Sequence, residues 1–277
     1  TEYEEYSCIT AVLGKGGKCF LLRSDMDGVP MREESGEPFA SENGCMHSCG
    51  HDLHTTILLG AAKILKKHEN ELNGTVKLLF QSGEETFEGA KAAIEAGILD
   101  NPHVDAAFAM HAASIIPADT IIYGTSPMAA VYGFRINLTG QGTHGSTPHL
   151  GVDPINTGVH IYLALQELIA REISPTDETA LTIGRFEAGN VSNVIPERAV
   201  LEGTLRTFKP EIRSRLIQRI DDIVHSVANT YRTEAKIEVL SDVPPVTCCP
   251  KMNQELLSSI LEMDEQIKTL PYYHVMG

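Results

Sequence analysis

Residues 46–56 read Met-His-Ser-Cys-Gly-His-Asp-Leu-His-Thr-Thr. Five side chains that bind metal ions or exchange protons fall within eight of these positions, namely His47, Cys49, His51, Asp52 and His54. An apolar run at helical spacing follows over residues 57–65, so the cluster is predicted just before, or on the first turn of, a buried helix. A helix start is rigid and its free N–H groups favour anions. A surface loop rich in histidine is the alternative, but this density before an apolar helix favours a binding site.

Upstream of this cluster, two predicted strands over residues 9–13 and 19–23 flank a glycine-rich turn, which is the pattern of a β-hairpin. The second strand runs into Asp25 and Asp27. Side chains two residues apart on a strand point the same way. These carboxylates could therefore bind metal or orient a ligand histidine. A polar turn at the end of the strand is an equally good interpretation of the same residues.

Downstream, two further apolar strands end in polar residues that can act chemically. A strand over residues 75–81 runs into Glu84 and Glu85, and a strand over residues 104–110 ends at His111. This alternation of strand, loop and helix predicts an α/β layer. In such sheets the ligand residues collect at the carboxyl ends of the strands. The alternatives are an exposed acidic turn and an ordinary histidine that follows a core strand.

The pattern changes after about residue 125. Strands are predicted over 131–139, 180–187, 199–207 and 235–240, and helices over 154–171 and 211–231. Their order is β-α-β-β-α-β, which is that of a ferredoxin-like fold. We therefore predict a domain over residues 125–241 that is inserted between two parts of the first domain, residues 1–124 and residues 242–277. The second part contains a predicted helix over residues 252–267.

The bulk composition narrows the class of protein. The chain has 277 residues and a formal net charge of −15, which argues against nucleic acid or an anionic membrane as a partner. No apolar run is long enough to span a bilayer. The six cysteines are scattered rather than spaced as a disulfide scaffold, so we expect a reducing compartment, the cytoplasm.

A hydrolytic metal site needs a few deprotonated ligands, an open position for water and a nearby base. Cys49, His51, Glu85 and His111 could supply the ligands. The side chains of Glu84 and Glu85 are neighbours and should diverge, so that one ligates while the other faces the water.

The resemblance to a known family is strong at this point. The chain is similar to the M20 family of metallopeptidases and amidohydrolases, in the branch of N-acyl-amino-acid amidohydrolases, hippurate hydrolases and auxin-conjugate hydrolases. The matching segments follow the family's order and are RSDMDGVP (23–30), HSCGHDLH (47–54), FQSGEE (80–85), MH (110–111), GTHGSTPH (142–149) and GNVSNVIP (189–196). The resemblance implies an α/β catalytic domain with a mixed sheet and an inserted ferredoxin-like domain that serves as lid and dimerisation surface.

The resemblance also implies roles for single residues. Cys49, His51, Glu85 and His111 match the ligands of a centre with two divalent metal ions, and Glu84 matches the general base that activates water and protonates the leaving amine. Because the ligands include Cys and His, Zn is expected, with Mn, Co or Ni as alternatives.

Four residues of the inserted domain match substrate-handling positions. His144 matches a histidine that steadies the oxyanion and that, in dimeric relatives, reaches the partner's site. Asn193 and Arg206 match residues that hold the substrate's carbonyl or carboxylate, and His149 matches a less regular substrate contact. From the residues alone, a loop histidine and an exposed strand arginine are the alternatives for His144 and Arg206.

The expected function is metal-dependent cleavage of N-acetyl or N-aroyl amino acids by a homodimer that pairs through the inserted domain. A dipeptidase or carboxypeptidase on the same scaffold is the first alternative. The family's pattern continues past Gly277 to one more ligand histidine, and His274 lies too early to match it. A truncated second part, and hence a catalytically impaired member of the family, is therefore the second alternative.

Overall fold

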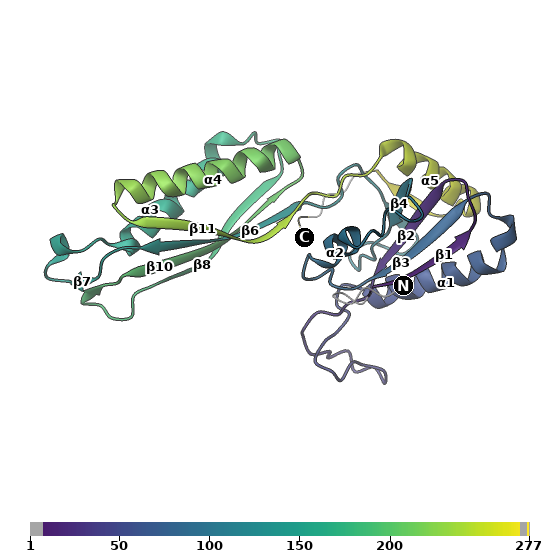
Figure 1. Cartoon of the computed structure of the whole chain (residues 1–277), viewed down its shortest axis with the longest axis horizontal. Helices are drawn as coiled ribbons and strands as arrows, with labels where there is room; N and C mark the ends of the chain where they lie inside the picture. Colours follow the sequence, from purple (N-terminus) through teal and green to yellow (C-terminus); the bar gives the residue numbers. More distant parts are fainter. Residues whose placement is uncertain (1–7, 272–275, 277) are drawn as a thin grey trace. The chain divides into compact units, whose positions relative to one another are not determined.

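The computed structural model describes residues 8–271 and 276. The chain divides into two compact units, Thr1–Pro117 and Ala118–Gly277 (Figure 1). The predicted division into three segments at residues 125 and 242 stays a prediction.

The first unit is built on a four-stranded mixed sheet in the order β1-β3-β2-β4. The strands are β1 (Ile9–Gly14), β2 (Cys19–Asp25), β3 (Thr75–Gln81) and β4 (Ala106–Ala109). The edge strand β1 is antiparallel to β3, whereas β3, β2 and β4 run parallel to one another. The predicted α/β class with a mixed sheet is confirmed.

The predicted hairpin is wrong, because β1 and β2 do not pair with each other. Strand β3 lies between them, and Thr75 at its start pairs with both Gly14 and Cys19. The short loop after β1 crosses over the start of β3, where the Thr75 N–H donates to Lys18 O and Thr75 Oγ1 donates to Gly16 O. Strand β3 carries buried side chains on both faces, so a central position removes more apolar surface from water than an edge position would.

Two helices cover opposite faces of this sheet. Helix α1 (His51–Lys67) packs Leu58 against Leu78, while α2 (Gly89–Glu95) packs Ala93 against Leu79. The neighbouring residues on β3 point to opposite faces, which explains the two separate clusters. Helix α1 is buried on one side only. Its apolar residues Leu53, Ile57, Leu59 and Ile64 are between 48% and 65% exposed.

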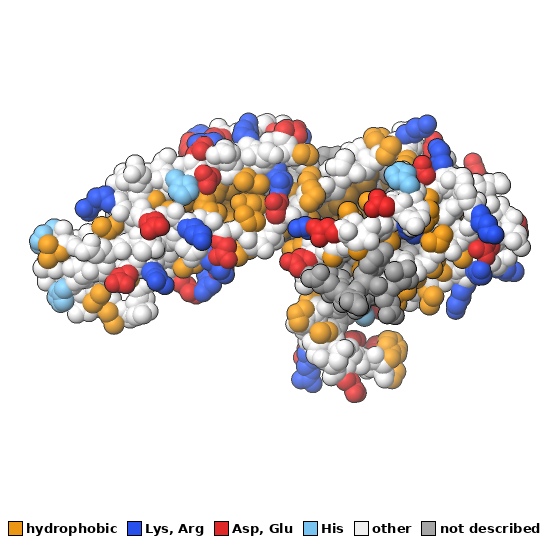
Figure 2. Space-filling view, viewed as in Figure 1, with side chains coloured by type: hydrophobic (Ala, Val, Ile, Leu, Met, Phe, Trp, Pro, Cys, Tyr) orange, Lys and Arg blue, Asp and Glu red, His pale blue; other side chains and the backbone are white. Residues whose placement is uncertain are grey.

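A long loop joins β2 to α1. Its two ends are pinned together by an antiparallel bridge between Val29 and Met46. The loop extends away from the sheet (Figure 1), and hydrophobic side chains on it face solvent (Figure 2), with Phe39 81% exposed. The bridge brings the chain back to the edge of the sheet where α1 begins.

The second unit contains a four-stranded antiparallel sheet in the order β11-β6-β10-β8. Two helices pack on one face of it. The elements in chain order are β6 (Ala130–Thr139), α3 (Pro154–Glu167), β8 (Thr179–Ala188), β10 (Arg198–Thr207), α4 (Pro210–Thr230) and β11 (Glu234–Val243). Alternate residues of β6, such as Phe134 and Ile136, are fully buried beneath the helices with Leu165 and Leu216.

Shorter elements complete the described chain. Strands β5 (Thr120–Ile122) and β12 (Lys268–Leu270) pair in parallel, and α5 (Pro250–Met263) precedes β12. The remaining elements are β7 (Thr143–His144), β9 (Val194–Ile195), single 3-10 turns at Glu69–Glu71 and Pro148–Leu150, and a π-helical turn at Leu168–Glu172. The predicted helix over 252–267 therefore ends early, and its last residues lead into a strand. Among the described residues no helix is long and apolar enough to cross a membrane.

Candidate metal centre

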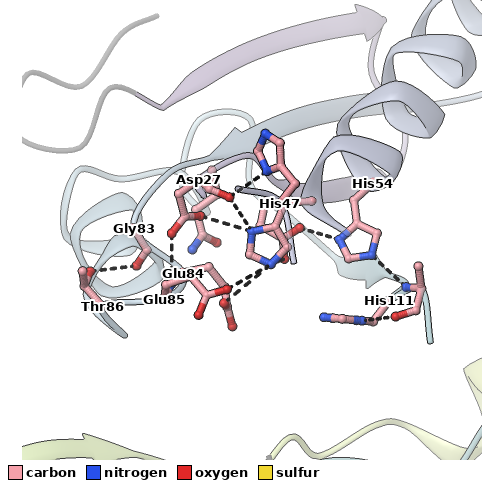
Figure 3. A network of polar contacts seen from close by, with 12 residues as sticks. Asp27, His47, His54, Gly83, Glu84, Glu85, Thr86 and His111 are labelled. Carbon is pink, nitrogen blue, oxygen red and sulfur yellow. Dashed lines mark hydrogen bonds and ion pairs between the residues drawn. The ribbon is translucent and has the colours of Figure 1, made fainter. Parts of the chain in front are cut away.

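The candidate ligands come together at one edge of the first sheet (Figure 3). Strands β3, β2 and β4 are adjacent and parallel, so their carboxyl ends share this edge. Glu84 and Glu85 follow β3, Asp27 follows β2, and His111 follows β4. Helix α1 starts at the same edge with His51, directly after Gly50 in the left-handed conformation (φ 81°). Residues far apart in sequence thus meet because of the strand order.

Two overlapping groups of side chains here are close enough to hold a cation. The ligand atoms of Cys49, His51 and Glu85 lie within 4.8 Å of one another, as do those of His51, His54 and His111. His51 Nε2 lies 3.9 Å from Glu85 Oε1, and both atoms are buried without a hydrogen-bond partner among the described residues. A buried lone pair and a buried carboxylate oxygen are costly when unpaired, so this pair fits a bound metal ion.

Hydrogen bonds fix which ring nitrogen each histidine presents. His51 Nδ1 donates to Asp27 O at 2.9 Å, and His111 Nδ1 donates to Ala112 O at 2.6 Å. A carbonyl can only accept, so the neutral rings carry their proton on Nδ1 and leave Nε2 free. The Asp27 side chain also accepts a 3.0 Å hydrogen bond from the Glu85 N–H. Asp27 therefore positions both His51 and Glu85.

Glu84 has the properties of a general base. Its Oε2 lies 3.8 Å from His51 Nε2, and its side chain is 36% exposed, so it borders both the centre and solvent. Burial, and after it the charge of Glu85, raises the pKa of Glu84 above its ordinary value. A base with a raised pKa takes a proton more readily at neutral pH.

The Cys49 thiol is protonated when no cation is bound. Hydrogen bonding to Glu85, followed by burial, raises the pKa of Cys49 to about 11. A metal ion binds the thiolate, so metal uptake at this position must release the proton.

The charge balance at this edge favours a cation. The carboxylates of Asp25, Asp27, Glu84 and Glu85 surround His51, and Arg23 makes an ion pair with Asp25 at 2.7 Å. Burial alone would raise the pKa of Asp25, but the hydrogen bond from His54 and the charge of Arg23 hold it below its ordinary value. The centre therefore carries excess negative charge, and its sulfur, nitrogen and oxygen donors suit Zn²⁺ and related ions.

His144 and Asn193 are neighbours within the second unit. His144 on β7 pairs with Val194 of β9, and the Gly145 N–H donates to Asn193 O at 2.8 Å. The Ser146 N–H donates to His144 Nδ1 at 3.2 Å, so the neutral ring carries its proton on Nε2, where it can donate to an oxyanion. The nearby His149 is exposed in the turn Pro148–Leu150.

Arg206 lies on β10 of the four-stranded sheet, at the end far from the His144 loop. It pairs with Val131 and Ala180, whereas Arg198, at the other end of β10, pairs with Thr139 beside the His144 loop. At about 3.3 Å per residue, about 26 Å of strand separates Arg206 from Arg198. Arg206 Nη1 is buried without a hydrogen-bond partner in the described chain, and burial lowers the pKa of this guanidinium. The second unit thus brings His144 and Asn193 together but holds Arg206 apart from them.

Comparison with known proteins identifies the family. The model of peptidase family M20/M25/M40 matches residues 21–277. The chain belongs to this family. It is 39% identical over 232 residues to the N-acetyl-L-cysteine deacetylase of Bacillus subtilis (strain 168), covering 83% of this chain and 55% of that protein. It is 35% identical over 272 residues to thermostable carboxypeptidase 2 of Saccharolobus solfataricus, covering 95% of this chain and 69% of that protein.

Solved structures agree with this assignment. A dinuclear metal-binding peptidase of the M20 family from Bacillus subtilis superposes with a TM-score of 0.82 at 29% identity, over 98% of this chain and 70% of that chain. The predicted resemblance to the amidohydrolase branch is confirmed. This M20 chain spans between about half and two thirds of the length of the curated relatives it matches.

Sequence reasoning missed one role in this M20 centre. His54 was grouped with the candidate ligands of the 46–56 cluster, yet both of its ring nitrogens are engaged within the protein. Its spacing from His51 puts both side chains on one face of the helix but does not distinguish a ligand from a residue that positions one. His274, which lies too early in the sequence to match the family's last ligand histidine, is outside the described residues.

Proposed function

We propose that the protein is a metal-dependent amidohydrolase that cleaves the amide bond of N-acetyl or N-aroyl amino acids. The observation that carries this proposal is the unpaired, buried pair of His51 Nε2 and Glu85 Oε1 beside Glu84, whose pKa is raised. A ligand pair next to a base is what hydrolysis of an unactivated amide requires. The deacetylase relative supports the substrate class.

Cys49, His51, Glu85 and His111 would hold two divalent metal ions, for which Zn²⁺ is our first choice and Mn²⁺, Co²⁺ and Ni²⁺ are the alternatives. The dinuclear relative supports two ions. Such ions polarise a carbonyl and lower the pKa of water. Glu84 takes the proton from the attacking water and delivers it to the leaving nitrogen. His144 Nε2–H donates to the oxyanion, Arg206 binds the substrate carboxylate, and Asn193 and His149 are further contacts.

We also propose that two copies of the chain form the working enzyme. His144 on β7 lies near the Arg198 end of β10, whereas Arg206 lies near the other end of β10, so one rigid second unit cannot present both to one substrate of amino-acid size. A second copy can supply His144. Strand β8 is an edge of the sheet, and beside it a mainly apolar groove is lined by Val159, Tyr162 and Leu163 of α3 and by Ile183, Gly184, Arg185 and Phe186 of β8. This groove suits the same surface of a second copy, and the inserted domain would then act as lid and dimerisation surface.

The dimer is tested by light scattering on a Leu163→Arg variant. Leu163 is 58% exposed, so the substitution should leave the fold intact and convert dimer to monomer. Val239→Arg on the opposite edge strand β11, where Val239 is 53% exposed, is the matched control and should stay dimeric. A parent protein that is already monomeric at working concentration would refute the proposal.

The activity is tested by measuring release of amino acid from N-acetyl- and N-benzoyl-amino acids by the intact protein before and after metal removal. Metal-dependent release supports the proposal. Cleavage of dipeptides with a free α-amine, without cleavage of the N-acyl substrates, would favour the dipeptidase or carboxypeptidase alternative, which the carboxypeptidase relative supports. Bound metal without any hydrolysis would favour a catalytically impaired member of the family.

We also propose that the protein works in a reducing compartment, the cytoplasm. All six cysteines are free, which supports this proposal.

A further inference from the structure

We propose that His54 is a positioning residue of the metal centre: its Nε2 holds the Ala112 N–H and thereby fixes the ring of His111 toward the metal ions. This inference rests on the proposed metal centre and adds to it a residue that binds no metal itself.

Both nitrogens of the His54 ring are used within the protein. Nδ1 lies 2.6 Å from Asp25 Oδ1, and the Ala112 N–H donates to Nε2 at 2.7 Å (Figure 3). Because a backbone N–H can only donate, Nε2 carries no proton, and Nδ1 must be the donor to Asp25. The residue is 4% exposed, so water does not compete for either bond. The lone pair of Nε2 is therefore not available to a metal ion while this bond exists.

This arrangement excludes one of the two possible ligand groups. His51, His54 and His111 are close enough together to bind one ion. However, His51 and His111 each direct Nδ1 to a backbone carbonyl and leave Nε2 free, whereas His54 has no free nitrogen. Of the three histidines, His51 and His111 are therefore ligands, and His54 is a positioning residue.

Ala112 transmits the position of His54 to His111. Its N–H is held by His54 and its carbonyl accepts from His111 Nδ1 at 2.6 Å, so both polar groups of one residue are fixed. Strand β4 ends at Ala109, so His111 is on a loop without ladder hydrogen bonds. The His54 and His111 rings also contact each other edge to face, with centroids 4.6 Å apart. Without His54, the exposed His111 ring keeps its bond to Ala112 O and a more distant edge contact with the His51 ring, with centroids 6.2 Å apart.

On the Nδ1 side of His54, Asp25 is held by several hydrogen bonds. Asp25 is 1% exposed and receives hydrogen bonds from His54 and from Arg23 Nη1. Arg23 Nε in turn donates to Gln81 Oε1 at 2.9 Å, which ties the network to the end of β3. His54 itself lies in the first turn of α1. A single ring therefore links the loop after β4 to β2, β3 and α1.

Two substitutions separate the two functions of the ring. The amide nitrogen of His54→Asn can replace Nδ1–H toward Asp25, but this side chain is too short to reach Ala112. The longer His54→Gln can offer its carbonyl oxygen to the Ala112 N–H.

Loss of an orienting partner typically weakens metal binding by about 10- to 100-fold. We expect a loss of this size for one of the two Zn²⁺ ions in the Asn variant, measured by competition with a chromophoric chelator, and affinity close to the parent's in the Gln variant. Exchange of the Ala112 amide hydrogen should be faster in the metal-free Asn variant only.

Equal losses in both variants, or no loss in the Asn variant, would overturn the proposal. If the Asn variant does not fold, the unsubstituted protein decides. With ¹⁵N-labelled histidine and ¹¹³Cd²⁺ as the bound ion, His51 and His111 should show nitrogen–cadmium coupling and His54 should show none; coupling at His54 would refute its role. A parent protein that binds no Zn²⁺ or Cd²⁺ would refute the proposed function instead, and the Ala112 exchange rates would still report on His54.

Discussion

The Glu85 N–H donates a 3.0 Å hydrogen bond to Asp27 Oδ2, although 58 residues of chain separate the two positions. The carbonyl of the same aspartate accepts from His51. Asp27 therefore sets the backbone of one candidate ligand and the ring of another.

Replacement of Asp27 should weaken metal binding without abolishing it. Asp27→Ala removes the acceptor for the Glu85 N–H, and an affinity loss of about 10- to 100-fold is expected. Asp52→Ala, at an exposed position in the first turn of α1, is the control, and it should change only stability, by about 0.3–1 kcal/mol through the helix dipole. Titration with Zn²⁺ and a competing chelator distinguishes the two; a larger affinity loss for Asp52→Ala would show that the assignment to Asp27 is wrong.

Glu84 should matter for rate and not for metal content. Glu84→Gln keeps the size of the side chain but cannot take a proton, so hydrolysis should fall by about 10²- to 10⁴-fold. Glu95→Gln, an exposed change on α2, should have no effect. Elemental analysis alongside the rates is required, because a variant that loses metal would report on ligation instead. Full activity of metal-loaded Glu84→Gln would exclude Glu84 as the base.

The reactivity of Cys49 should depend steeply on pH in the metal-free protein. Because its pKa is raised to about 11, the thiol stays protonated below that pH, and its alkylation by iodoacetamide should rise only as the pH approaches about 11. Glu85→Gln removes the main cause of the shift, so the rise should move toward the ordinary value of 9.0. Mass spectrometry of the alkylated peptides measures this, with the exposed Cys249 as internal reference. A parent profile that already levels off near pH 9 would contradict the contact with Glu85.

Arg206 should be important for substrate binding while contributing little to stability. Its Nη1 is buried without a partner in the described chain, and removal of an unpaired buried charge is often neutral or stabilising. Arg206→Met should therefore leave the free energy of unfolding in urea unchanged or higher, while KM for a substrate with a free carboxylate rises. Arg206→Lys keeps the charge and should show an intermediate KM. Marked destabilisation by Met would indicate a structural ion pair instead.

Two leucines on α3 should differ sharply in their effect on stability. Leu165 is fully buried in the core of the second unit, so Leu165→Ala is expected to lower the free energy of unfolding by about 2–5 kcal/mol. Leu163 is 58% exposed, and Leu163→Ala should change the unfolding free energy of the monomer by no more than about 0.5 kcal/mol. Urea unfolding at a concentration low enough to keep the chain monomeric measures both. Similar losses of unfolding free energy would contradict the burial of Leu165 and the exposure of Leu163 on α3.

The sequence allowed the edge of the sheet to be predicted, because Glu85 and His111 each come within four residues of the end of an apolar strand. It did not allow the strand order to be predicted. The glycine turn after β1 is compatible with a hairpin, and only the two-sided burial of β3 decides against it. The role of His54 could not be predicted either, since its partners Asp25 and Ala112 are 29 and 58 residues away and one of them is a backbone N–H. Backbone donors carry no signature in a sequence.

The insertion of β3 between β1 and β2 affects the order in which the first unit assembles. Strand β1 has no partner until β3 exists, and the bond from Thr75 to Gly16 closes a loop of 59 residues. Because β1 pairs on one side only, it can detach without breaking the β3–β2 ladder. The parallel trio β3-β2-β4 keeps its own ladders when that edge strand detaches. Of the strands that lead to the metal-binding edge, the central β3 and β2 should exchange their amide hydrogens more slowly than the edge strands β1 and β4.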